Sequence, residues 1–82
     1  MKNTRKTKDT VDVMFVYGND WTGVYFSGVL KDENHSLDAG VILEYLVGKT
    51  IASVDCVTAD EDWLDTETQL PEKLSDVVIA KK

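Results

Sequence analysis

Residues 11–30, VDVMFVYGNDWTGVYFSGVL, decide the fold of this chain. Apolar side chains alternate along 11–17, which is the period of a β-strand buried mainly on one face. Short runs of glycine, asparagine, aspartate and serine separate this segment from 21–26 and from 29–32, and both of these have β-type composition. The stretch therefore predicts an antiparallel meander of three strands.

The middle strand of this meander places different side chains on the two faces of the sheet. Val24 and Phe26 point to one face, while Trp21 and Tyr25 point to the other. We expect Val24 and Phe26 to face a helix. In that arrangement Trp21 and Tyr25 lie on the outer face, with Gly23 as a gap between them.

A helix over 37–47 is expected to follow the meander. Ser36 is a suitable N-cap, and Gly48 stands where a glycine commonly ends a helix. The apolar residues of the segment form a single stripe that can cover one face of the meander, namely Leu37, Val41, Ile42, Tyr45 and Leu46.

The pattern weakens beyond this helix. Residues 50–58 are rich in β-branched side chains and predict a fourth strand, whereas 59–70 is either a loop or a frayed helical turn. Pro71 suits the first position of a short helical turn, and 77–79 predicts a brief final strand. We therefore expect an α+β fold, in which a small antiparallel sheet (the three-stranded meander plus one or two further strands) packs on one α-helix.

Charge is distributed unevenly along the 82 residues. The first eight hold four of the nine basic side chains and none of the fifteen acids, so the remainder carries a net charge of −10. The sequence predicts a flexible basic tail at 1–9 and a single α+β domain at 10–82. An acidic domain repels nucleic acid and attracts basic proteins, so we expect a protein or small-molecule partner and not a nucleic acid.

The localisation that we expect is cytoplasmic. Cys56 is the only cysteine, so no disulfide can form within the chain, and a reducing compartment fits best. The basic start is not followed by the apolar run of a signal peptide, and no apolar stretch approaches the ~20 residues that span a bilayer. A chain of 82 residues has a thin core, and a second copy could add buried apolar area, so a homo-oligomer is possible.

Few residues could support catalysis or metal binding. His35 is the only histidine, and no basic residue lies close in sequence to Cys56 to activate its thiol. Zinc sites need several cysteine or histidine ligands, and the acidic run has no glycine where a calcium-binding loop requires one. We expect a non-enzymatic protein with no catalytic residue, no metal and no cofactor.

Two surfaces are candidates for binding. The first is an acidic face within 55–72, a stretch without lysine or arginine, and it comprises Asp60, Glu61, Asp62, Trp63, Asp65 and Glu67. Such a face can occupy a basic cleft on another protein, although acidic runs are often only solvated. The second is a ligand site of Trp21, Tyr25, His35 and Ser36, where aromatic rings can stack on a base and a helix start can hold a phosphate. Aromatic side chains also commonly serve only to fill a core.

Three short motifs carry a resemblance that covers residues 11–79. They are G-N-D-W-x-G-x-Y at 18–25, N-H-S-L at 34–37 and L-P-E-x-L-x-D-V at 70–77. In their order they are similar to those of short uncharacterised bacteriophage and bacterial accessory proteins. The resemblance implies a small phage-type protein, acting in the cytoplasm of the host cell, that binds a host molecule.

Two functions follow as hypotheses. In the first, the protein inhibits a host factor, such as a defence component, by covering its basic surface with the acidic face. In the alternative, an oligomer acts as a sponge that sequesters a small nucleotide signal at the second site. The choice depends on the oligomeric state, because a chain of this length supplies the walls of a pocket most easily at a symmetric interface.

Overall fold

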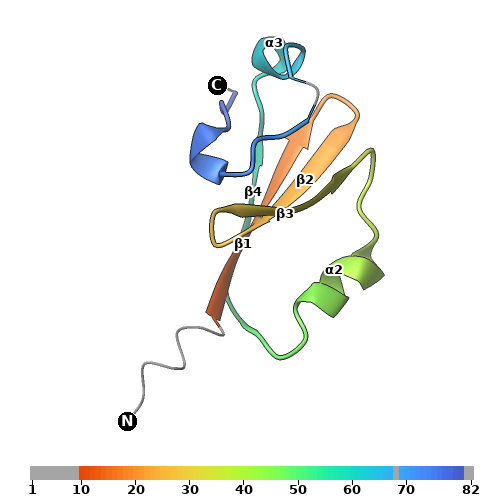
Figure 1. Ribbon diagram of the computed structural model, residues 1–82, viewed down its shortest axis with the longest axis vertical. Coiled ribbons are helices and arrows are strands. Elements are labelled where there is room, and N and C mark those ends of the chain that lie inside the picture. Colours follow the sequence, from red (N-terminus) through yellow and green to blue (C-terminus); the bar gives the residue numbers. More distant parts are fainter. Residues whose placement is uncertain (1–9, 68, 81–82) are drawn as a thin grey trace.

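A four-stranded sheet with the strand order β3-β2-β1-β4 forms the centre of the computed structural model (Figure 1). The structure describes residues 10–67 and 69–80, so the predicted basic tail lies outside the described residues. The elements in chain order are β1 (Thr10–Gly18), β2 (Trp21–Phe26), β3 (Val29–Asn34), α2 (Ala39–Tyr45), β4 (Thr50–Thr58), α3 (Glu61–Leu64) and the 3-10 helix η1 (Leu74–Asp76).

The three-stranded meander is confirmed. β1, β2 and β3 pair antiparallel through two tight turns. Asp20 has a φ of 63° in the first turn, and Ser27 and Gly28 have φ values of 50° and 86° in the second. Two successive residues with positive φ are typical of a hairpin turn whose twist matches that of its strands.

The α+β class is confirmed, but the sheet is mixed and not wholly antiparallel. β4 runs parallel to β1, with Val13 opposite Val54 and Phe15 opposite Cys56. The reason is the connection through α2, because a strand that follows a helical crossover can return in the direction of an earlier strand. An all-antiparallel sheet was therefore the wrong expectation for the fourth strand.

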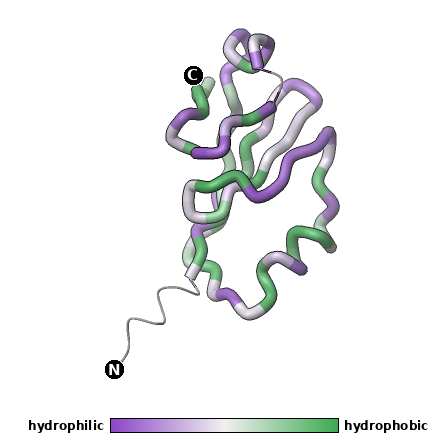
Figure 2. Tube along the Cα trace, viewed as in Figure 1, coloured by the Kyte–Doolittle hydropathy of each residue, from purple (hydrophilic) through white to green (hydrophobic). Residues whose placement is uncertain are grey.

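The helix α2 covers part of one face of the sheet. Ile42 packs with Val11, Val13 and Val24 in one buried cluster, and the ring of Phe26 meets the ring of Tyr45 edge-on at 6.2 Å. The helical region is among the more hydrophobic parts of the chain (Figure 2). The expected orientation of Val24 and Phe26 toward the helix is thus confirmed.

α2 is shorter than predicted, and its N-cap is not Ser36. Asp38 caps the helix instead, since its Oδ1 accepts a hydrogen bond from the backbone N–H of Gly40 at 2.7 Å. Aspartate is at least as good an N-cap as serine. Gly48 has a φ of 82°, as expected for the glycine that follows a helix.

The segment 69–80 crosses the opposite face of the sheet from its β3 edge to its β4 edge. Backbone bonds tie it to β3 at Leu30, whose N–H donates to Glu72 O at 2.7 Å, and to β4 at Thr58, whose carbonyl accepts from Ala80 N at 2.8 Å. The predicted final strand at 77–79 is reduced to one antiparallel bridge between Ala59 and Ile79.

A second buried cluster lies between this segment and the sheet. Its members are Val16, Tyr25, Ala59, Leu70 and Val77. The prediction that Pro71 opens a helix is also wrong, because the 3-10 turn η1 begins only at Leu74. The sheet is therefore covered on both faces, by a helix on one and by irregular chain on the other.

Candidate functional site

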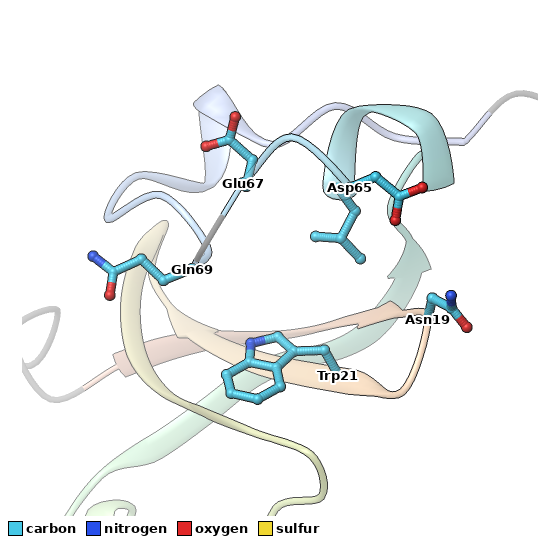
Figure 3. Close-up of a pocket in the computed structure, with 6 residues that line it drawn as sticks. Asn19, Trp21, Asp65, Glu67 and Gln69 are labelled. Atoms are coloured by element: carbon cyan, nitrogen blue, oxygen red, sulfur yellow. The ribbon is translucent and has the colours of Figure 1, made fainter.

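A hollow of about 270 Å³ opens between the β1–β2 turn and the chain around α3 (Figure 3). We call it the Trp21 hollow, and its lining residues are Asn19, Trp21, Leu64, Asp65, Glu67 and Gln69. The indole ring of Trp21 forms one side, and Asp65 and Glu67 lie on the other side, with the carboxylate of Glu67 directed away from the indole (Figure 3). One residue of the predicted aromatic site and two of the predicted acidic face thus meet at one place.

Close packing of α3 on the β1–β2 turn creates the hollow. A side chain added at Gly18 would collide with the side chain of Leu64, so the absence of a Cβ there allows the helix to approach. Leu64 and Trp63 both pack against the cluster on this face of the sheet. The position of the acidic residues that follow therefore depends on a glycine 46 positions before Leu64.

Asp60 and Trp63 have structural roles within the predicted acidic face. Asp60 is the N-cap of α3, with its Oδ1 accepting from Trp63 N at 3.0 Å, and its own N–H donates to Val78 O at 2.8 Å. Trp63 is half-buried. The side chains of Glu61, Asp62, Asp65 and Glu67 remain exposed and form the accessible part of that face.

Glu33 holds the indole of Trp21 in place. The Trp21 Nε1–H donates to Glu33 Oε1 at 2.9 Å, and the same oxygen accepts from the backbone N–H of Leu70 at 2.8 Å. The polar edge of the indole is therefore already bonded. Its face is what remains to line the hollow.

His35 packs against the ring of Trp21. The imidazole meets the indole edge-on, with ring centroids 4.9 Å apart and an interplanar angle of 78°. His35 Nδ1 lies 3.2 Å from the carbonyl oxygen of Asp20 and 3.5 Å from its carboxylate. Because the side chain of His35 is 71% exposed, it is an outer neighbour of the Trp21 hollow and not part of its lining.

Tyr25 is buried, so the predicted pairing of Trp21 and Tyr25 on an exposed face is wrong. Its ring is fully covered, and its hydroxyl donates to Pro71 O at 2.6 Å. The gap expected at Gly23 is filled, since a side chain there would collide with Leu70. Burial raises the pKa of Tyr25 to about 12, and the negative charges of Glu33 and Asp76 act in the same direction.

Ser36 is exposed and lies two residues before the N-cap of α2. The carboxylate of Asp38 already occupies the first free N–H of that helix, at Gly40. The predicted phosphate position at Ser36 therefore has no helix start beside it. Of the four residues in the predicted ligand site, only Trp21 and His35 lie together on the surface.

The hollow is electrostatically suited to a cation. Two carboxylates and the face of an indole are the groups that surround bound guanidinium and ammonium ions in proteins. Within residues 10–67 and 69–80, no lysine or arginine forms an ion pair with an acid, and so no such pair occupies Asp65 or Glu67. Thr66 Oγ1 donates to Trp63 O at 2.6 Å and lies 3.1 Å from Glu67 Oε2.

Four residues of this region, including Leu64 in the lining, were not among the site residues predicted from the sequence. Asn19 and Gln69 line the hollow, and Glu33 positions Trp21. A signal existed for Glu33, because an acid in a β-strand one hairpin away from a tryptophan can accept its indole N–H. The position of Gln69 depends on packing between distant segments and has no local signal.

Within residues 10–67 and 69–80 there is no group of three or more histidine, cysteine, aspartate or glutamate side chains that could hold a metal ion. None of the helices in the described part of the chain is long and apolar enough to cross a membrane.

Comparison of the chain with protein families, with curated proteins and with solved structures finds no match.

Proposed function

We propose that this chain is a small, non-enzymatic binding protein of phage type that inhibits a host factor, such as a defence component, through its acidic surface. The partner is a protein with a basic surface. Its interaction with this chain is centred on the Trp21 hollow, where an arginine or lysine side chain of the partner lies between the indole and the two carboxylates.

The observation that carries the proposal is the composition of the hollow. The indole N–H at the polar edge of Trp21 donates to Glu33, so the face of the ring is the part that remains for a partner. Asp65 and Glu67 line the opposite side of the hollow, of about 270 Å³, as exposed side chains whose carboxylates are turned away from the indole (Figure 3). Sites for whole small molecules usually range from about 300 to 1,000 Å³, so this hollow fits one long side chain better than a nucleotide.

The surrounding charges extend the site. Glu61 and Asp62 are exposed in the first turn of α3, where they add to the negative potential near the hollow. A surface of one sign raises the association rate with a partner of the opposite sign, and salt weakens this effect. We expect binding to fall steeply between low salt and about 1 M salt, where the Debye length shrinks to about 3 Å.

The alternative of a nucleotide sponge receives less support. Two of its four residues do not serve a surface site, since Tyr25 is buried and Ser36 lies outside the start of α2. The carboxylates of Asp65 and Glu67 beside Trp21 also repel a phosphate. Native mass spectrometry of protein from signal-producing cells would revive the alternative if it revealed a bound nucleotide.

The test is capture of a partner from bacterial lysate with the tagged full chain at low salt. After identification of the partner, affinity is measured for the wild type and for Asp65→Asn/Glu67→Gln. Each exposed contact with a charge is worth up to about 1 kcal/mol, so the double variant is expected to bind about tenfold more weakly. Trp21→Leu should weaken binding as well.

The matched control is Glu44→Gln/Glu72→Gln. It removes the same two charges from exposed positions that do not line the hollow. The control is expected to retain wild-type affinity within about twofold. Equal loss in both double variants would mean that net charge and not the hollow governs binding, and the absence of a basic partner would contradict the proposal as a whole.

A further inference from the structure

β4 is an edge strand with little cover. Of its nine residues, only Val57 is even partly buried, although its composition is that of a half-buried strand. Val54 is 60% exposed and Ile51 is 45% exposed. An exposed edge with apolar side chains and without lysine or proline is a template for pairing with another strand.

The outer edge of β4 has free backbone groups at its centre. Ala59 N donates to Tyr17 O in β1, whereas Thr58 O accepts from Ala80 N on the opposite side. By alternation, the backbone groups of Val54 and Cys56 also point to the outer side. The carboxylate of Asp55 accepts from Cys56 N, while no described residue bonds the outward N–H and C=O of Val54.

An apolar groove of about 350 Å³ adjoins this edge. It lies between α2 and the sheet, and Phe15, Leu43, Ile51 and Val54 are among its lining residues. None of the residues that line it carries a charge. Leu43 is 64% exposed at the rim.

We propose that β4 and this groove bind a second copy of the chain, with the two β4 strands antiparallel about a twofold axis at Val54. In that register Val54 exchanges both backbone bonds with its own copy, and Asp55 of one copy lies opposite Ser53 of the other. A register centred one residue later would place two Asp55 side chains opposite each other, which is unfavourable.

A second copy fits this face better than a basic partner does. A groove without charge offers no attraction to a basic surface, whereas a twofold axis places like apolar patches against each other. Leu43, Ile51 and Val54 are 64%, 45% and 60% exposed, so a second copy can cover them, and the β4 backbone and the half-buried Phe15 extend this surface. A standard interface covers roughly 800 Å² per partner.

The test is sedimentation velocity of the full chain between about 1 and 200 μM. We expect a dimer whose dissociation constant rises at least tenfold in Val54→Lys. The matched control is Val29→Lys, an exposed valine on the opposite edge of the sheet, which should dimerise as the wild type does. A wild type that stays monomeric, a dimer unaffected by Val54→Lys, or equal loss in both variants would overturn the proposal.

A cross-link provides a second measurement that does not depend on the folding of the lysine variant. Val54→Cys in a Cys56→Ser background should form a covalent dimer under mild oxidation or with a short bismaleimide, and failure to do so would also overturn the proposal. The outcome is independent of the proposed function, because Asp65→Asn/Glu67→Gln should dimerise normally and Val54→Lys should still bind the basic partner.

Discussion

Replacement of Tyr25 by phenylalanine removes one oxygen atom from the most deeply buried part of the second cluster. The ring keeps its place, but the bond of 2.6 Å from the hydroxyl to Pro71 O is lost. That bond joins β2 to the segment that crosses the sheet. The variant therefore measures how strongly this segment is held.

At neutral pH the free energy of unfolding should fall by about 1 to 2 kcal/mol. The net contribution of a hydrogen bond is about 0.5 to 1.5 kcal/mol, and an acceptor left without a partner adds to the loss. A small domain has a total stability near the lower end of about 5 to 15 kcal/mol. The expected loss is therefore a large fraction of the total free energy of unfolding.

The difference should reverse at high pH. The pKa of Tyr25 is about 12 in the folded chain and about 10 when unfolded. A raised folded-state pKa gives stability that is complete below pH ~10 and is lost as pH rises through ~12, because the unfolded chain releases its proton first. The wild type should lose about 2 kcal/mol over that window, whereas Tyr25→Phe does not, so the two curves cross near pH ~11.

The assay is urea denaturation followed by tryptophan fluorescence from pH 7 to about 11.5. Tyr17→Phe is the control, since Tyr17 is 43% exposed and should change stability by less than about 0.5 kcal/mol. Equal stability of wild type and Tyr25→Phe at pH 7, or a difference that is constant with pH, would refute the reasoning.

Two further substitutions test the supports of the Trp21 hollow. Glu33→Ala leaves Trp21 Nε1–H and Leu70 N–H without their shared acceptor and should lower the free energy of unfolding by about 2 to 3 kcal/mol. Glu33→Gln keeps an oxygen at this position and should lower it by less. Urea denaturation compares the two variants, and an equal loss in both would contradict the role of the shared oxygen. Gly18→Ala forces the end of the Leu64 side chain to move and should cost about 1 kcal/mol, so an unchanged melting temperature would argue against close packing of α3 on the turn.

The parts of the fold that could be predicted are those with local signals. The two hairpin turns use residues that tolerate positive φ, at Asp20 and at Ser27 and Gly28. The alternation of 11–17 places Val13 on the face that meets Ile42. These patterns act between neighbours in sequence and need no knowledge of distant contacts.

The direction of β4 and the cover of the second face could not be derived in the same way. A strand reached through a helix has no local mark of its direction, although a strand-helix-strand order favours a parallel return. The segment 69–80 shows no strand periodicity because it is held by two backbone hydrogen bonds at each end and not by a continuous ladder. The sequence therefore did not predict that this segment covers Tyr25.

The candidate site was predicted in pieces. Trp21, Asp65 and Glu67 were each singled out from the sequence, but they were assigned to two separate surfaces. The contact between position 18 and Leu64 brings them together, and it depends on packing and not on spacing. The only sign of this contact in the sequence is Gly18, a glycine just before a turn.

The crossing of the sheet by 69–80 sets the order in which the chain can complete its fold during synthesis. The hairpin of β1 and β2 emerges from the ribosome early, yet the hydroxyl of Tyr25 waits for a partner 46 residues further along the chain. Until that partner emerges, one face of the hairpin stays exposed to solvent and to other nascent chains. Contacts of such long range form slowly and leave apolar surface uncovered meanwhile. The nascent protein therefore completes the face of the sheet that holds Tyr25 only after residues 69–80 have emerged.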